Sequence, residues 1–135
     1  MKKFIFVLLL FPMGLLAQTT LSVKIHNVAS SEGAVNVAVY NSDETFLKFE
    51  GVVKSGSTKA KKGVVTLEIE EIPEGEYALA IFHDENGNNE LDTNWLGIPK
   101  EKVAFSKSKM KTFGPPKYKE CAFLVEKDTK VDVYF

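Results

Sequence analysis

The chain has 135 residues, 17 of them basic and 18 acidic, and a formal net charge of −1 at pH 7. Every basic residue is lysine, so the chain lacks the arginine forks and the basic face by which nucleic-acid-binding proteins contact phosphates. We therefore expect no nucleic-acid partner. The length favours a single domain.

The first 17 residues have the three parts of a secretory signal peptide. Lys2 and Lys3 give a basic start, residues 4–16 are mostly apolar, and Ala17 is a small residue suited to the position before a cleavage site. The apolar run is shorter than the roughly 20 residues that span a bilayer, and no comparable run follows. We predict cleavage after Ala17, export to the periplasm or the extracellular space, and no membrane span.

Residues 18–135 would form the exported domain. Gln18 stands where a lipoprotein needs a cysteine, so we expect no lipid anchor. The only cysteine, Cys121, lies in the apolar run 121–125, which predicts a buried, unreactive thiol and rules out an internal disulfide. Without Lys2 and Lys3, 15 lysines face 18 acidic residues, a net charge of −3.

Apolar and polar residues alternate along most of residues 20–135, which is the pattern of half-buried strands. We predict strands in the ranges 20–28, 34–40, 64–72, 76–83, 102–105 and 129–135. A glycine-ended turn at 29–33 and a Pro-Glu-Gly turn at 73–75 predict two β-hairpins, one around each turn.

The remaining segments are less regular. Residues 45–49 follow helix-capping residues and predict a short helical turn, and residues 120–125 fit a strand or a short helix. The lysine-rich stretch 54–62 fits a mobile solvated loop or an edge strand blunted by lysine better than an anion-binding patch. Short strands with frequent turns and no long helices predict an all-β fold, an antiparallel β-sandwich of about seven strands with at most one or two short helical turns.

The stretch after the strand 76–83 is the candidate functional site. Five residues with side-chain oxygens recur at alternate positions: Asp84, Asn86, Asn88, Glu90 and Asp92. They match positions 1, 3, 5, 7 and 9 of a calcium-binding loop, the seventh through its backbone carbonyl. Asn89 replaces the glycine usual at position 6. Trp95 occupies position 12, where a calcium loop has a bidentate carboxylate, and Glu101 could supply that carboxylate if the loop folds back. The pattern predicts a weak calcium site, and a metal-free loop held by side-chain-to-backbone turns stays open as the alternative.

Other side chains near this loop suggest further roles. His83 and its neighbouring carboxylates are the only basis for a small hydrolase, and the sequence lacks a zinc-ligand spacing or a nucleophile motif. A histidine that packs at the strand end is the more ordinary interpretation. Trp95, Phe113 and Tyr118 lie in predicted loops, where aromatics either stack on sugars and peptides or, more ordinarily, pin the loop to the core.

Three blocks carry a resemblance to a known family. They are residues 72–84, IPEGEYALAIFHD, residues 85–101, ENGNNELDTNWLGIPKE, and residues 113–116, FGPP, followed by Ala122 and Phe123. They resemble the uncharacterised secreted bacterial family known as domain of unknown function 2141. The resemblance implies an exported sandwich of the transthyretin or prealbumin kind, in line with the transthyretin- or immunoglobulin-like sandwich that the strand pattern predicts, and it supplies no catalytic residue. The family usually has glycine where this chain has Asn89, and asparagine tolerates the positive φ angle that such a glycine serves.

These observations predict an exported, non-catalytic binding or interaction module with a protein, peptide or carbohydrate ligand. Two alternatives remain at this stage. One is a secreted hydrolase that uses His83 and nearby carboxylates, and the other is a structural envelope protein whose loop holds no metal.

Overall fold

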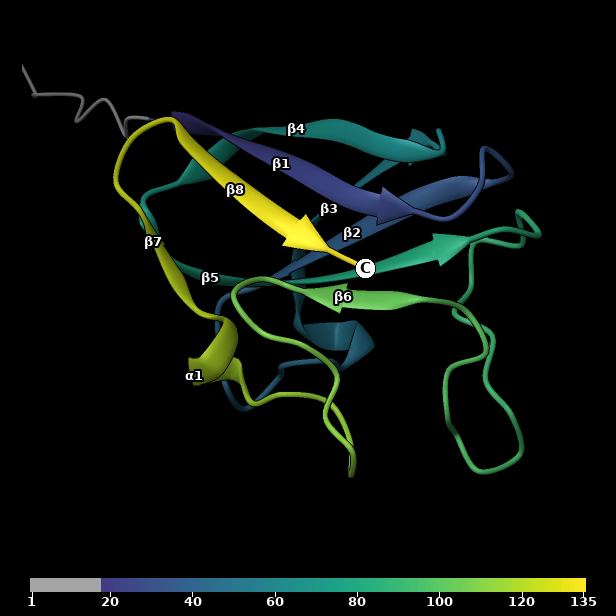
Figure 1. Ribbon diagram of the computed structural model, residues 1–135. Coiled ribbons are helices and arrows are strands. Elements are labelled where there is room, and N and C mark those ends of the chain that lie inside the picture. The colour runs from purple at the N-terminus through teal and green to yellow at the C-terminus, as the bar shows by residue number, and fades with distance from the viewer. Residues whose placement is uncertain (1–17) are drawn as a thin grey trace, which may run out of the picture.

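The computed structural model describes residues 18–135, which form two β-sheets packed face to face (Figure 1). The first sheet has three strands in the order β4 (Gly63–Pro73), β1 (Gln18–Val28) and β8 (Thr129–Tyr134). The second sheet has four strands in one row, which are β3 (Val52–Lys59), β2 (Ala34–Tyr40), β5 (Gly75–Asp84) and β6 (Val103–Phe105). A short strand, β7 (Phe123–Val125), pairs with the start of β5.

The architecture confirms the predicted all-β sandwich. It has eight strands where we expected about seven, and every pair is antiparallel except β1 with β8, which runs parallel. Within residues 18–135 the helical structure amounts to the 3₁₀ turn η1 (Phe49–Gly51) and the four-residue helix α1 (Tyr118–Cys121). The predicted signal peptide, residues 1–17, lies outside the described residues.

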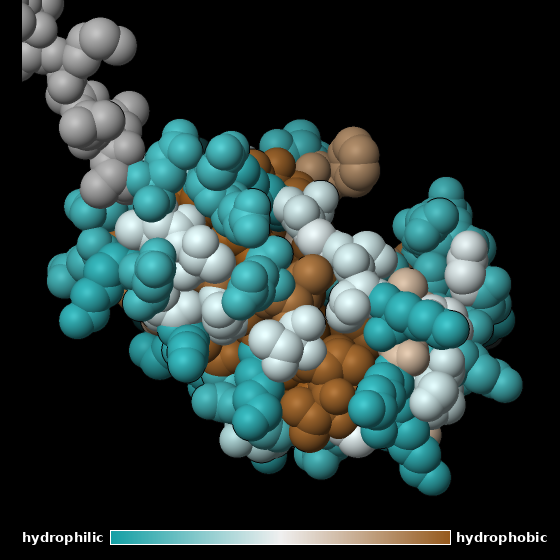
Figure 2. Space-filling model, turned by 90° about the horizontal axis from the view of Figure 1, so that it is seen from above, coloured by the Kyte–Doolittle hydropathy of each residue, from teal (hydrophilic) through white to brown (hydrophobic). Residues whose placement is uncertain are grey.

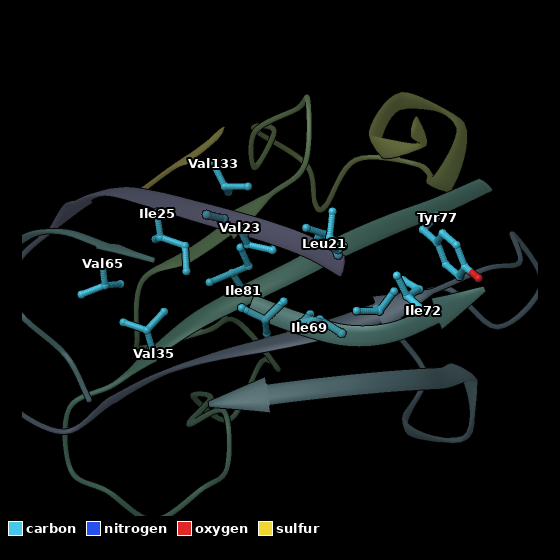
Figure 3. Close-up of a cluster of buried hydrophobic side chains, with 14 of the residues drawn as sticks. Leu21, Val23, Ile25, Val35, Val65, Ile69, Ile72, Tyr77, Ile81 and Val133 are labelled. Carbon is cyan, nitrogen blue, oxygen red and sulfur yellow. The ribbon is translucent and has the colours of Figure 1, made fainter. Parts of the chain in front are cut away.

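The main core lies between the two sheets. Side chains of β1 and β4 point inward and meet those of β2 and β5 (Figure 3). Leu21, Val23 and Ile25 of β1 are fully buried, as their alternation with polar residues predicts. Burial of apolar area at about 25 cal/mol per Å² makes this layer the main source of stability.

The first predicted hairpin is wrong. Strands β1 and β2 are joined by the turn that contains Gly33, but they lie in different sheets: β1 pairs with β4 and β8, and β2 pairs with β3 and β5. A β-bulge follows Ile25, and Asn27 adopts a left-handed φ of 60°. The bulge and the turn carry the chain across the sandwich, so that Val28 and Val35 still face the same core.

The second predicted hairpin is also wrong. The turn at 73–75 connects β4 of the first sheet with β5 of the second. A hairpin would require these two strands to pair with each other in one sheet. Glu71 has a left-handed φ of 55° just before the turn, and the Tyr77 hydroxyl donates a 2.7 Å hydrogen bond to the carbonyl of Pro73. A short turn serves a hairpin and a sheet-to-sheet corner equally well, so the local sequence does not separate the two.

The lysine-rich segment is an edge strand rather than a mobile loop. Residues 52–59 form β3, which pairs with β2 on one side and leaves its other edge unpaired. Exposed lysines along an edge discourage pairing with a second chain. At Gly56, an added Cβ would lie 2.8 Å from a methyl carbon of Leu67, so the two sheets approach closely at this position.

The outer side of the second sheet carries a smaller apolar cluster. Tyr40, Phe46 and Tyr118 pack edge to face, with ring centroids 5.3 and 5.7 Å apart, and Cys121 is fully buried beside them. Phe46 belongs to the turn segment before η1, and Tyr118 begins α1. The segments around η1 and α1, below the second sheet in Figure 1, are therefore attached to it by a core of their own.

The outer side of the first sheet is different. Figure 2 looks onto it and shows hydrophilic residues over most of the face, with some apolar surface between them. His26 of β1 stacks on Tyr134 of β8 at 4.4 Å and lies 2.7 Å from an Asp132 carboxylate oxygen. These contacts tie the parallel pair β1 and β8 together on the solvent side.

Candidate functional site

The long loop between β5 and β6 begins at the last residue of β5, Asp84, and extends below the second sheet in Figure 1. The Asp84 side chain is fully buried. Its Oδ1 accepts the backbone N–H of Gly87 at 2.9 Å, and its Oδ2 accepts that of Asn89 at 2.8 Å. Asp84 therefore fixes the first turn of the loop, and both of its oxygens already have hydrogen-bond donors.

The shape of this turn depends on Asn89. Its φ angle is 61°, which confirms the left-handed conformation expected where the family has glycine. Asparagine is among the few residues that adopt it at modest cost. This conformation lets the Asn89 N–H point back to Asp84.

The other oxygen-bearing residues form a network around Asp92. The Asn86 amide donates to one carboxylate oxygen of Asp92, and the Asn88 amide donates to the other at 3.0 Å. The amide oxygens of Asn86 and Asn88 accept backbone N–H groups two residues further on. These are the side-chain-to-backbone turns of a self-supported loop.

A hollow of about 440 Å³, open to solvent, lies beside this network. It is lined by Glu85, Asn86, Asp92, Thr93, Lys100 and Glu101. Glu101 Oε2 also accepts the backbone N–H of Asp92 at 3.2 Å, so the loop does fold back to this residue. Among residues 18–135, no group of three or more His, Cys, Asp or Glu side chains is gathered closely enough to hold a metal ion.

These positions divide the predicted calcium ligands. Asp84 faces backbone donors, whereas Asp92 and Glu101 border the hollow. Glu90 is exposed, and its backbone N–H donates to the Asn88 side chain at 3.0 Å. Both Asp92 carboxylate oxygens accept the Asn86 and Asn88 amides, and Glu101 Oε2 accepts a backbone N–H, so in this arrangement the loop's own donors occupy these oxygens as well.

His83 lies under the loop, with only 1% of its surface exposed. Its Nε2 lies 2.8 Å from the carbonyl of Glu32, so Nε2–H is the donor. Its Nδ1 has no hydrogen-bond partner among the described residues and is 3.6 Å from a carboxylate oxygen of Glu85. A substrate has no open path to this ring, which packs against Phe135 instead.

Trp95 lies at the far end of the loop on a tight turn. The Asn94 side-chain oxygen accepts the backbone N–H groups of Leu96 and Ile98, and the Gly97 N–H donates to the Asn94 carbonyl at 2.9 Å. Gly97 has a φ of 77°, which its lack of a side chain permits. The turn holds Trp95 at 91% exposure, so our expectation that it pins the loop to the core is wrong.

The segment between β6 and α1 forms a second tight turn. Lys111 and Gly114 exchange backbone hydrogen bonds of 2.9 and 3.3 Å, which leaves Thr112 and Phe113 at the tip. Phe113 is fully exposed, so the pinning interpretation also fails there. Tyr118 does pin the segment, because it is buried against Phe46 and its hydroxyl donates to the Glu76 carbonyl at 3.3 Å.

Sequence reasoning missed three residues that matter here. Phe49 of η1 is 96% exposed, and Met110 is exposed near Phe113. Ser106 is buried: its hydroxyl donates to the Cys121 carbonyl at 2.7 Å and accepts the Leu79 N–H at 2.9 Å, which anchors the second turn. A lone serine after a short strand gives no sequence signal. The exposure of Met110 and Phe113 could have been predicted, because these apolar residues lie among lysines and prolines in the segment 107–117.

The fold and these loops define a class of protein, an all-β sandwich with a self-supported acidic loop and exposed aromatic turns on the outer side of one sheet. The chain belongs to the family described as an uncharacterized protein conserved in bacteria (DUF2141), whose model matches residues 23–133. No curated protein and no solved structure matches it significantly. None of the helices within residues 18–135 is long and apolar enough to cross a membrane.

Proposed function

We propose that the protein is an exported, non-catalytic binding module that uses its two aromatic turns to contact a partner. The observation that carries this proposal is the exposure of Trp95 and Phe113 on turns that backbone hydrogen bonds hold in place. Fully burying a large apolar side chain stabilises a complex by about 1.5–3 kcal/mol. A rigid turn presents that side chain without the entropy loss of ordering a flexible loop.

The position of the turns supports a shared contact surface. Both extend from the same side of the second sheet, and η1, with exposed Phe49, lies on that side too (Figure 1). Large aromatic anchors dominate the energetics of many interfaces. Isolated exposed apolar residues are ordinary on protein surfaces, whereas aromatics held exposed on two well-ordered turns favour a functional role.

Export rests on residues 1–17 and their match to a signal peptide. It places the module in the periplasm or outside the cell. The proposal is tested by mass spectrometry of the protein recovered from a cell-envelope or medium fraction. A chain that begins at Gln18 supports export, and a chain that retains Met1 and is found only in the cytoplasm contradicts it.

A hydrolase receives less support from the geometry. Its one candidate base, His83, is buried, and its Nε2–H is already bonded to a backbone carbonyl. A general base must come within hydrogen-bond reach of the proton that it abstracts. A purely structural envelope protein does not require Trp95 and Phe113 to be held exposed on ordered turns, so their exposure favours a binding module over that alternative.

The binding proposal is tested with the chain's own fluorescence. Trp95 is the only tryptophan, so its emission reports directly on ligand contact at the turn. Soluble peptidoglycan fragments, oligosaccharides, peptide pools and lipid vesicles are titrated into residues 18–135, the part that contains the strands of both sheets. We expect one class to shift the emission, and Phe113→Ser to weaken that binding about tenfold.

Val64→Ser is the matched control, because Val64 is an exposed apolar residue on β4 of the other sheet. It should leave the titration unchanged. A failure of all four classes to move the Trp95 signal, or an equal effect of both substitutions, would count against the aromatic turns as the binding surface.

We retain calcium as a proposed ligand of the acidic loop. Asp92 and Glu101 line the open hollow, as does Glu85. Two carboxylates with neutral oxygens suit the weak affinity of extracellular calcium modules, a Kd of about 10⁻⁴–10⁻³ M. Calcium at this position would stiffen the loop that carries Trp95.

A further inference from the structure

The segment 106–119 combines positive charge with exposed apolar residues. It contains five lysines and no acidic residue: Lys107, Lys109, Lys111, Lys117 and Lys119. All five are exposed, and so are Met110 and Phe113 between them. The rest of the chain is net acidic, so this charge is concentrated on one turn.

The contacts of these lysines leave most of the charge available. Lys111 pairs with Glu120 at 2.5 Å, and Lys107 donates to the Ala122 carbonyl at 3.0 Å. Within residues 18–135, Lys109, Lys117 and Lys119 take part in no ion pair. The hydrogen bond from Lys111 holds the pKa of the Glu120 carboxyl below its usual range, so Glu120 is ionised at neutral pH. Its single negative charge offsets one of the five positive charges.

The turn is anchored at both ends and rigid at its tip. Ser106 and Tyr118 are buried at its two ends, and Pro115 and Pro116 follow the hydrogen-bonded tip. Phe113 therefore stands away from the protein as a fixed feature, with lysines on both sides. A partner can receive the ring without ordering the turn.

We propose that this turn docks on an anionic lipid surface, with Phe113 and Met110 entering the headgroup region and the lysines contacting acidic headgroups. The inference rests on the proposed function and names the partner of its second aromatic turn. Apolar residues flanked by lysine are the composition of interfacial membrane anchors. Lysines near such a surface interact with its negative potential, and their stems reach past an inserted ring.

The kind of cation favours lipid over a specific protein or nucleic-acid partner. The chain has no arginine, the residue suited to bidentate recognition of one carboxylate or phosphate. Lysine is a mobile point charge that suits a diffuse layer of headgroups. The exposed aromatic tip adds an apolar contact that a soluble polyanion would not use.

The experiment uses residues 18–135, which contain all strands of both sheets and lack the apolar start of the chain that would itself bind lipid. Co-sedimentation is measured with vesicles of phosphatidylcholine alone and with added phosphatidylglycerol. We expect binding that requires phosphatidylglycerol and weakens with salt. Phe113→Ser should lower the affinity about tenfold, and Lys109→Gln with Lys119→Gln about twentyfold.

Lys24→Gln with Lys130→Gln is the charge-matched control, because both residues are exposed on the outer side of the first sheet. It should change the affinity less than twofold. All substituted residues are exposed, and thermal melts test whether each variant stays folded.

Four results would overturn the proposal, and the first three concern vesicle binding. They are no sedimentation with either vesicle, equal sedimentation with both, and an equal loss in the turn variant and the control. Binding of polyphosphate that depends on the lysines but not on Phe113, without vesicle binding, would show a polyanion site and also overturn it. If any of these results is obtained and sugars or peptides still shift the Trp95 emission, the proposal of a binding module is retained and only the proposal of a lipid partner is rejected.

Discussion

At the scale of single residues, Asp84 shows how one pattern serves two purposes. Alternating oxygen side chains predict cation ligands, yet this carboxylate is buried and binds two backbone N–H groups. A short polar side chain at the end of a strand satisfies the first free donors of a loop in the same way that it caps a helix.

We therefore expect Asp84→Ala to destabilise the fold by about 2–3 kcal/mol, because it leaves two N–H groups without a charged acceptor. Urea unfolding followed by circular dichroism measures the change. Glu90→Ala, an exposed substitution in the same loop, should stay within about 0.5 kcal/mol of the parent. Equal effects of the two changes would mean that the turn does not depend on Asp84.

Gly33 lies directly against the backbone of Asp84. An added Cβ would be 1.8 Å from the Asp84 carbonyl oxygen, and the φ of Gly33 is 70°. We expect Gly33→Ala to prevent folding or to destabilise it by more than about 4 kcal/mol, since backbone atoms would have to move.

Gly63→Ala is the control for Gly33→Ala, because Gly63 also has a positive φ, 104°, but has no atom near its missing Cβ. It should cost about 1–2 kcal/mol of backbone strain alone. Thermal melts of the two variants compare them, and similar melting temperatures would refute the steric explanation.

The buried thiol of Cys121 makes the free energy of unfolding depend on pH in the alkaline range. Burial raises the pKa of its thiol from 9.0 to about 11, so the folded state disfavours the thiolate. Its stabilising contribution is complete below the unfolded pKa and is lost as the pH rises through the folded one. We expect the free energy of unfolding to fall between pH 9 and about 11.

Cys121→Ala should remove part of this pH dependence, and the rest should continue toward about 12, where burial and then the nearby Glu76 carboxylate place the pKa of Tyr118. Urea unfolding of both proteins at several pH values measures it. An unchanged slope in the variant would mean that the thiol does not titrate with unfolding.

At the scale of elements, the loop of Asp92 and Glu101 is the place for the calcium test. We expect millimolar calcium to raise the melting temperature relative to chelator, since ten times a Kd of about 10⁻³ M corresponds to about 1.4 kcal/mol. Asp92→Asn with Glu101→Gln should abolish the rise. Glu90→Gln, whose side chain lies outside the hollow, should keep it.

Equal melting temperatures in calcium and in chelator would leave the hydrogen-bonded loop as the whole explanation of the alternating oxygens. Calorimetry at the same calcium concentrations checks the result. Asp84 is left intact in this experiment, because changing it would alter the fold for a separate reason.

The exposed turns mark the limit of prediction for elements. The sequence placed Trp95 and Phe113 in loops correctly, because proline, glycine and asparagine punctuate both segments. It did not predict which aromatic returns to the core. That depends on whether a receiving surface exists, and Tyr40 and Phe46 supply one for Tyr118 alone.

At the scale of the whole molecule, β8 completes the sandwich. It pairs in parallel with β1, more than 100 residues away in sequence, and buries Val133 in the main core. We expect a chain that ends at Glu126 to remain unfolded, since β1 loses one of its two neighbours. Circular dichroism and amide chemical-shift dispersion test this.

Val133→Ala is the milder companion of this truncation. It should remain folded and lose about 2 kcal/mol, the usual effect of a small cavity in a packed core. A truncated chain with the stability of the parent would show that the first sheet does not need its third strand.

The sequence by itself determined the fold class, most of the longer strands and the family. Residues 34–40 alternate cleanly and form β2 with those bounds, and Cys121 is buried as its apolar neighbours indicate. These properties depend on side-chain periodicity and on local backbone preference, which neighbouring residues carry. The left-handed φ angle of Asn89 was likewise predictable from the local sequence.

Only the tertiary structure decided which strands pair and which side chains remain exposed. Both predicted hairpins became crossings between sheets, because a short turn permits either outcome and the core between the sheets selects one. The role of Asp84 and the exposure of Phe113 were settled in the same way, by the donors and surfaces that distant segments bring near. Such contacts leave no local trace in a sequence, since the partners are set by the packing of the whole chain.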